Sequence, residues 1–372
     1  MSHTLRELLH PVAIRKVIST IATPLSRFQD FYGTGIGGPY NQDIGGDVFS
    51  WDIFDKTRKI ANARPQGTGP ERIIPQKIGQ VSARAYRSHG SLKLLYAKIF
   101  RNRVLGGNMD MGNVDVSGQK YIKSQLQFAA QQYKNAREFM LNRLLRCSGF
   151  YLKIEGDQWI PTDTATSFKV DYKIPASQVG TVGGIFAGTW DEAAAPIHDE
   201  LLALNAYTQQ QTGYPIEHAW INSTMWGYLL KNTQIKGLAG TSNSPFAQYD
   251  RVDKYSEEGI RDNGFVGVLR GIPWIHWHVY DGVLEVDGTE SALVEPNKAI
   301  FTPAPSSMWL ETYNGSELVL ENTHSQPYEA FGFTNWHTHV IDPAAVELKF
   351  LDNSLPALYL PKAIFNATVA SP

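Results

Sequence analysis

The longest periodic pattern in the chain covers residues 118–146. Apolar residues recur in it at spacings of three and four, which is the period of one face of a helix. Ser117 is placed to cap the first turn and Gly149 to end the helix. The pattern therefore predicts a helix roughly 40 Å long, enough to cross a whole domain. The residues predicted to face the core are Ile122, Leu126, Tyr133, Met140 and Leu144.

Two shorter helices are predicted in the second half of the chain. One begins near Pro196, since proline is favourable at the first helical position, and runs to Thr212. The other covers residues 223–232, and Asn222 is placed to cap it. Both helices are expected to supply one core, and the predicted core residues are Leu201, Leu204, Trp226 and Leu230.

Alternation of apolar and polar residues predicts strands on both sides of these helices. Residues 48–54 and 78–86 alternate and flank a polar stretch with Pro and Gly at its tip, which indicates an extended hairpin. Residues 267–280 and 283–286 are predicted to be two strands joined by a tight turn at Asp281 and Gly282. Further strands are predicted at residues 168–174, 219–222 and 298–302 and within residues 340–368.

The predicted hairpin is rich in charged residues and poor in apolar ones. Little buried core can anchor such a hairpin within its own subunit, so we expect another molecule to support it. The residues predicted to contact a neighbouring subunit are Arg58, Lys59, Arg64, Arg72 and Lys77.

The first 47 residues differ in composition from the rest of the chain. A short amphipathic segment at residues 5–21 is followed by a glycine-rich stretch, which predicts a flexible arm without a core of its own. Residues 33–38 satisfy the spelling G-x-G-x-x-G. A dinucleotide site needs that run between a strand and a helix. Pro39 and Tyr40 follow instead of a helical pattern, so an arm is favoured over a cofactor site.

Composition limits the class of protein. Hydrophobic residues make up 42% and charged residues 19% of the chain, which is typical of a globular protein and not of a disordered one. Cys147 is the single cysteine, so a disulfide framework within the chain and cysteine-based zinc or iron–sulfur sites are excluded. No apolar run reaches the length of about 18 residues that spans a bilayer. We therefore expect a soluble protein that is made in the cytoplasm.

The net charge of −2 conceals an asymmetry along the chain. Residues 1–150 contain 22 Lys and Arg against 10 Asp and Glu, giving +12, whereas residues 151–372 contain 12 against 26, giving −14. Uneven decoration of a solvated surface is the simplest interpretation. A sharper one is that the basic half of one copy meets the acidic half of another. Nucleic-acid binding is a third, but no DNA- or RNA-reading module is present, so self-association is favoured.

Two histidine pairs are the main candidates for chemistry. His276 and His278 share one face of a predicted strand, as do His337 and His339, because alternate strand residues point the same way. Four imidazoles could hold zinc or another transition metal, but no Asp or Glu stands at ligand spacing in either pair. Packing beside Trp274, Trp277 and Trp336 is therefore favoured over a metal site. No nucleophile elbow, Walker loop or zinc-protease motif occurs. The sequence therefore predicts no catalytic, cofactor-binding or metal-binding residue.

Three stretches of the chain resemble the lambda-type major capsid proteins of tailed phages, the phage capsid E family. They are residues 188–232, 267–282 and 348–369. The order of the predicted elements is also similar to that of this family: an arm, a charged hairpin, a long helix, a mixed block and closing strands. The resemblance covers most of the chain from about residue 48.

The resemblance implies an α+β fold of the tailed-phage major capsid type, also known as the Hong Kong phage type. Residues 1–47 would be the N-terminal arm, and residues 48–90 the E-loop, an extended hairpin that lies across a neighbouring subunit. The peripheral domain would comprise residues 91–189 and 339–372 with its spine helix at 118–146, and the axial domain residues 190–338. The axial domain would cluster at the five- and six-fold positions of an icosahedral shell.

The function implied by the resemblance is structural and not enzymatic. Copies would form pentamers and hexamers of the head that encloses the double-stranded DNA of a tailed phage, with DNA contacted only non-specifically and no membrane involved. The implied partners are a portal and a scaffold or protease, and a decoration protein is left open. The protein would be made and assembled in the host cytoplasm and would reside in the virion. Two alternatives are an encapsulin-like nanocompartment shell and a cytoplasmic metalloenzyme that uses the histidine pairs.

Overall fold

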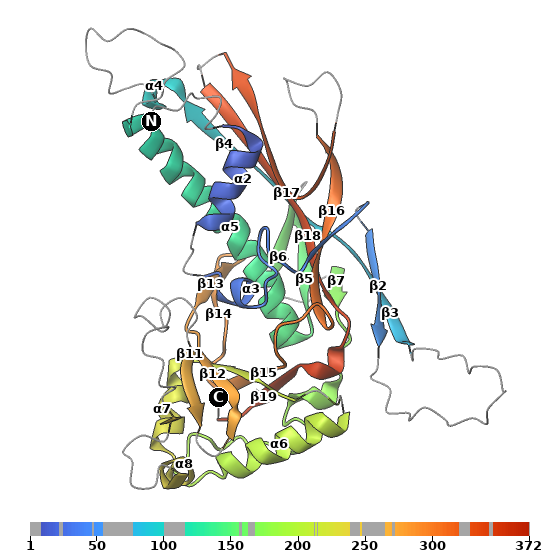
Figure 1. The fold of residues 1–372 in the computed structure, drawn as a ribbon, viewed down its shortest axis with the longest axis vertical. Helices are drawn as coiled ribbons and strands as arrows, with labels where there is room; N and C mark the ends of the chain where they lie inside the picture. The colour runs from blue at the N-terminus through green and yellow to red at the C-terminus, as the bar shows by residue number, and fades with distance from the viewer. Residues whose placement is uncertain are drawn as a thin grey trace, which may run out of the picture.

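The computed structural model is organised around one long helix and two large sheets (Figure 1). The long helix, α5, covers Val116–Cys147 and runs from one end of the molecule to its middle. One large sheet lies beside its N-terminal half and the other lies beyond its C-terminal end. The structure describes residues 9–21, 25–46, 48–54, 77–99, 116–155, 158–162, 168–211, 213, 215–238, 246–247, 265–269, 272–319, 328–341 and 345–371.

The three helices predicted from the sequence are confirmed. α5 extends slightly beyond the predicted range at both ends, while α6 covers Ile197–Gln211 and α7 covers Ser223–Lys231. Asn222 caps α7, since its Oδ1 accepts the backbone N–H of Met225 at 2.9 Å. The other described helices are short: α2 (Pro11–Thr20), α3 (Arg27–Phe31), α4 (Tyr96–Ile99) and α8 (Thr233–Leu238), with 3-10 turns at Ala176–Gln178 and Pro361–Ala363.

A five-stranded sheet packs on the N-terminal half of α5. One buried apolar cluster joins this half of the helix to α2 and to the sheet, and it contains Ile14, Leu126, Tyr133 and Phe350. The first strand pairs in parallel with the second, and the other pairs are antiparallel. The strand order is β1 (Asn41–Ile44), β16 (Leu310–Val319), β17 (Tyr328–Val340), β18 (Ala345–Leu358) and β4 (Tyr86–Leu95).

Two predicted domain boundaries fall inside strands of this sheet. The boundary after residue 90 lies within β4, and the boundary after residue 338 lies within β17. β16 and most of β17 belong to the predicted axial range, yet both pair with β18 of the predicted peripheral range. The pairing of strands therefore crosses both predicted boundaries, because it joins segments that are far apart in the sequence.

A seven-stranded sheet forms the other end of the molecule, where the C-terminus also lies (Figure 1). Its core contains Leu204 of α6, Met225 of α7, and Trp277 and Phe301 of the sheet. The strand order is β10 (Phe246–Ala247), β11 (Phe265–Leu269), β12 (Ile272–Val279), β9 (His218–Ile221), β15 (Lys298–Thr302), β19 (Phe365–Thr368) and β8 (Val179–Gly180).

The predicted hairpin turn at Asp281 and Gly282 is wrong. β11 and β12 are separate antiparallel strands, and β13 (Val283–Val286) pairs with β14 (Thr289–Ala292) instead of with β12. The two-residue turn of that hairpin is Asp287 and Gly288, with φ of 53° and 73°, as such turns require. Asp281 instead accepts the backbone N–H of Ser223 at 2.8 Å, at the start of α7.

The described part of the predicted arm packs against the rest of the molecule. Ile14 and Ile18 of α2 are fully buried, and so is Phe28 of α3. The backbone of β1 pairs with β16 over four residues. Residues 9–21 and 25–46 therefore contain buried side chains whose packing partners lie in the rest of the molecule. The glycine-rich run after α3 forms turns, and β1 follows it where a dinucleotide site would need a helix.

Two small sheets complete the described structure. β2 (Val48–Phe54) pairs with β3 (Lys77–Arg84), and β5 (Gly149–Glu155) lies between β6 (Gln158–Thr162) and β7 (Phe168–Asp171). The helix α5 ends just before Gly149, as predicted. A Cβ at Gly149 would lie 2.0 Å from the carbonyl oxygen of Val170, so the close approach of β5 to β7 requires glycine here.

Candidate functional site

Five residues of the predicted hairpin are predicted to contact a neighbouring subunit. Arg58, Lys59, Arg64 and Arg72 are outside the described residues. Lys77 is the first residue of β3, and only its backbone is described. Their contact with a neighbouring subunit stays a prediction.

The base of the hairpin is anchored in the core of its own subunit. Phe49, Trp51 and Ile53 alternate on the inner face of β2 and are buried. Trp51 donates its Nε1–H to the carbonyl oxygen of Leu358 at 3.0 Å. Tyr313 packs edge-on against the rings of Phe49 and Trp51, at centroid distances of 5.7 and 6.1 Å. The expectation that little core anchors this hairpin is thus wrong for its base, because β16 and β18 supply that core.

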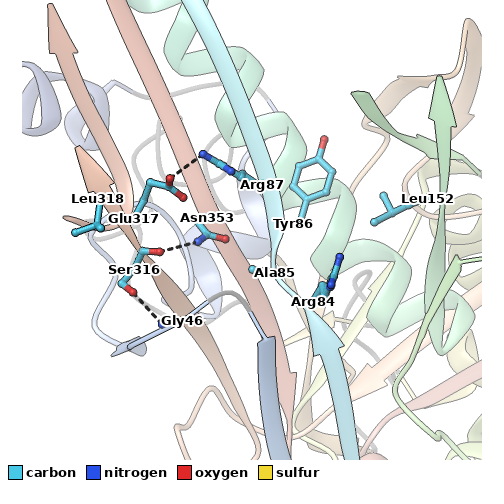
Figure 2. Close-up of a pocket in the computed structure, with 10 residues that line it drawn as sticks. All are labelled: Gly46, Arg84, Ala85, Tyr86, Arg87, Leu152, Ser316, Glu317, Leu318 and Asn353. Carbon is cyan, nitrogen blue, oxygen red and sulfur yellow. Dashed lines mark hydrogen bonds and ion pairs between the residues drawn. The ribbon is translucent and has the colours of Figure 1, made fainter. Parts of the chain in front are cut away.

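A groove opens beside this base and forms the candidate site (Figure 2). Its volume is about 440 Å³, within the usual range of ligand and peptide clefts. Ser316, Glu317 and Leu318 of β16 form one side, and the junction of β3 and β4, residues 84–87, forms the other. Asn353 of β18 lies between the two sides. We call this site the hairpin-base groove.

The hairpin-base groove is charged at its mouth and polar at its floor. Arg87 forms an ion pair with Glu317 across it, at 2.8 Å, with 57% of the arginine side chain exposed. Arg84 is also exposed, and it has no charged partner in the part of the chain that the structure describes. Leu318 is 70% exposed at the rim. The mouth therefore presents a net positive charge beside an exposed aliphatic side chain.

Asn353 at the floor of the groove has an unused hydrogen-bond acceptor. The residue is 1% exposed, and its Nδ2 donates to the carbonyl oxygen of Ser316 at 3.4 Å. Its Oδ1 is buried without a partner among the described residues. Buried polar atoms are rarely left unpaired, and this one is able to accept a further hydrogen bond. Gly46 closes one end, where its N–H donates to Ser316 Oγ at 2.8 Å.

Sequence reasoning did not find this groove. Arg84, Glu317 and Asn353 are contributed by three segments that are separated by more than 30 residues along the chain. No periodicity links them, since each follows the alternation of its own strand. Only the pairing of β18 with both β4 and β16 brings them together.

The five predicted core residues of the long helix are all buried. Ile122, Leu126 and Tyr133 contact the five-stranded sheet and α2, whereas Met140 and Leu144 belong to a second cluster that includes the base of the hairpin. α5 therefore links the hairpin base to the rest of the molecule through continuous packing.

Buried charged residues on α5 hold the N-terminal segment. Glu138 accepts the backbone N–H groups of Phe28 and Gln29, at 2.8 and 3.0 Å, and the hydroxyl of Tyr280 at 3.0 Å. Lys134 donates its Nζ–H to the carbonyl oxygens of Ser19 and Ile21. Burial raises the pKa of Glu138 to about 7, although these hydrogen bonds act in the opposite direction.

The predicted core of the shorter helices is only partly right. Leu201 and Leu204 of α6 are fully buried. Trp226 is half-buried at the edge of the same cluster, and Leu230 is 39% exposed, so the prediction for Leu230 is wrong. Met225 and Leu229 are the residues of α7 that face the core. Positions 226 and 230 lie one residue further round the helix, about 100° from that face.

The structure separates the two histidine pairs that the metalloenzyme hypothesis needs together. His276 and His278 lie on β12 of the seven-stranded sheet, and His337 and His339 on β17 of the five-stranded sheet. No group of three or more His, Cys, Asp or Glu side chains that could hold a metal ion occurs among the described residues. The four imidazoles therefore do not form one site.

His218 of β9, which the sequence did not single out, is the neighbour of the first pair. Its Nδ1 lies 3.1 Å from Nε2 of His278, and its ring lies 5.2 Å from that of His276. Phe31 packs edge-on against it at 4.7 Å. Burial and then the two neighbouring histidines lower the pKa of His218 to about 3. The group is a packed aromatic cluster between α3 and the sheet, in which the ring of Trp220 stacks on that of His278 at 4.4 Å.

No helix in the described part of the chain has both the length and the apolar character needed to cross a membrane.

Comparisons with known proteins agree on one class. The family model for phage major capsid protein E matches residues 25–369. A search of curated proteins finds no match. Among solved structures, a prophage protein of Escherichia coli CFT073 assigned as a capsid protein superposes with a TM-score of 0.55 at 13% identity, covering 100% of both chains. A phage-related protein of Bordetella bronchiseptica RB50 superposes with a TM-score of 0.52 at 10% identity, covering 100% of this chain and 98% of that one. At these identities the two structures show the fold alone.

Proposed function

The chain belongs to the phage major capsid protein E family and is a major capsid protein, and from this premise we propose how it builds a shell. Copies assemble into pentamers and hexamers and then into the icosahedral head that encloses the double-stranded DNA of a tailed phage. The observation that carries this proposal is the family match over residues 25–369, together with the mixed helix and sheet fold that the superposed structures share. The role is structural and not enzymatic.

The hairpin β2–β3 is the element that we propose to lie across a neighbouring subunit. The base of the hairpin is held in the core by Phe49 and Trp51. An element whose base is already ordered loses less conformational freedom on binding, which lowers the cost of association. Many such contacts, each weak, close a symmetric shell cooperatively.

The remaining partners and the location follow from the same role. The shell would meet a portal and a scaffold or protease during assembly, and its inner surface would contact DNA without reading the sequence. Assembly would take place in the host cytoplasm and the product would be the virion head. An encapsulin-like compartment would use the same fold with a cargo enzyme in place of DNA.

Electron microscopy of the purified protein at several concentrations and salt levels tests the proposal. We expect closed, uniform shells or rings of five and six copies. The protein is also expressed together with the proposed scaffold or protease, so that a requirement for these partners does not hide assembly. A compact monomer under every condition, with and without partners, would contradict the proposed function. Packaged DNA inside shells would distinguish the phage head from a cargo compartment.

Reversing the charges of Arg58, Lys59 and Arg64 tests the hairpin contact. We expect the variant to fold normally, because no described core residue is changed, but to assemble poorly. Circular dichroism checks the fold and sedimentation velocity measures the assembled fraction. Normal shells from this variant would show that the hairpin does not act as a charged clamp.

A further inference from the structure

The hairpin-base groove and an acidic hairpin on the opposite flank of the molecule have complementary surfaces. Figure 1 shows β13 and β14 on one side of α5, and β2, β3 and β16 on the other. A head-to-tail contact that closes a ring joins two different patches on opposite sides of each subunit. The positions of the two surfaces fit that requirement.

The outer face of the β13–β14 hairpin carries two exposed carboxylates. Glu285 and Glu290 are directly opposite each other in the strand register, and both are exposed. Like charges at directly opposed positions destabilise a strand pair. Neither carboxylate has a cationic partner within the described residues, whereas Asp287 at the turn is paired with Lys153. A cation supplied from outside the subunit would relieve this repulsion.

The two surfaces match in their apolar parts as well as in charge. Val283 lies on the same face of β13 as Glu285 and is 43% exposed, and Leu318 at the rim of the groove is 70% exposed. The groove offers Arg84, which has no charged partner among the described residues, and Arg87, which has more than half of its side chain exposed. Each surface thus combines an exposed aliphatic side chain with charges of one predominant sign, and the signs are opposite.

We propose that the hairpin-base groove of one copy binds the β13–β14 hairpin of a second copy, with Arg84 and Arg87 facing Glu285 and Glu290. The buried Oδ1 of Asn353 would accept a hydrogen bond from the inserted hairpin, which would satisfy an atom that has no partner among the described residues. The basic contribution comes from residues 1–150 and the acidic one from residues 151–372, as the asymmetry of charge along the sequence suggests. This inference rests on the proposed assembly into a shell and assigns two surfaces to it.

A charge exchange tests the contact. Arg84→Glu alone and Glu285→Arg alone should each reduce the assembled fraction about tenfold at matched concentration, as expected when a close ion pair is replaced by repulsion. Combining the two substitutions in one chain should restore assembly. Lys123→Glu, an equal charge reversal on an exposed face of α5, is the matched control and should assemble like the natural protein.

The outcomes separate this inference from the proposed function. Normal assembly of Arg84→Glu, or failure of the combined variant to recover, would overturn the inference while shells of the unmodified protein still supported the function. A second measurement does not depend on complete shells. In a Cys147→Ser background, copies carrying Arg84→Cys and copies carrying Glu285→Cys are mixed and oxidised. We expect disulfide-linked pairs only in the mixture, and their absence would also overturn the contact.

Discussion

The two halves of α5 follow the same helical period but have different surroundings. In the first half, up to residue 136, one face is buried through Ile122, Leu126 and Tyr133, and the opposite face is exposed, with Phe128 60% accessible. In the second half, residues 137–145 are all buried. The buried residues there include Arg137, Glu138, Asn142 and Arg143.

The difference arises from what covers the polar face. Asp352 of β18 binds the guanidinium of Arg137 through two hydrogen bonds of 2.7 Å. The N-terminal segment covers Glu138, and β14 covers Arg143, whose Nη2 donates to Ser291 Oγ at 2.8 Å. An amphipathic pattern therefore identifies the face that is apolar, but it does not show whether the polar face meets water or another part of the protein.

Among substitutions in the two halves of α5, Arg137→Ala should lower the unfolding free energy most. The substitution leaves the carboxylate of Asp352 buried without its partner, which typically costs about 3–5 kcal/mol of unfolding free energy. Denaturant unfolding followed by fluorescence measures the change. Gln132→Ala, on the exposed face of the first half, is the matched control and should change the unfolding free energy by less than about 0.5 kcal/mol. Equal losses in the two variants would remove the distinction between the halves.

Glu138→Gln should alter how stability depends on pH. The pKa of Glu138 is raised to about 7, so between its ordinary value of 4.5 and pH 7 the folded protein binds a proton that the unfolded chain lacks. Its contribution to the unfolding free energy therefore falls as the pH rises through this window, by about 3 kcal/mol in total. The glutamine variant should lose that dependence.

The contribution of His218 to the unfolding free energy changes with pH in the opposite direction to that of Glu138. Its pKa is lowered to about 3, so its contribution is lost as the pH falls from about 6.5 towards 3. The two groups partly offset each other in the natural protein. Unfolding measured from pH 5 to 8 should show a steeper loss on acidification in Glu138→Gln than in the natural protein. Parallel pH profiles would contradict the raised pKa of Glu138.

Phe128→Ala should change the unfolding free energy least. The side chain is mostly exposed on the first half of α5, so little buried surface is lost and the unfolding free energy should change by less than about 0.5 kcal/mol. Thermal unfolding measures this change. Leu144→Ala, at a fully buried position of the second half, should lower the unfolding free energy by about 2–5 kcal/mol in the same assay.

The elements with strong local signals were predictable. The long apolar stripe of α5, the Asn222 cap of α7 and the alternation in β2 each depend on residues close together in the sequence. The local prediction failed where two signals compete. Asp281-Gly282 and Asp287-Gly288 have the same turn spelling, and the pairing of β13 with β14 selects the second.

The sequence by itself therefore determined the helices α5, α6 and α7, several of the strands, the asymmetry of charge and, through resemblance, the capsid class. Only the tertiary structure decided which strands share a sheet, that Leu230 lies outside the core, and that residues 9–21 and 25–46 pack on the body. It also brought Arg84, Glu317 and Asn353 into one groove. The physical reason is that hydrophobic periodicity is a property of residues close together in the sequence. Burial of a polar face and pairing of distant strands depend instead on which distant segment packs against them.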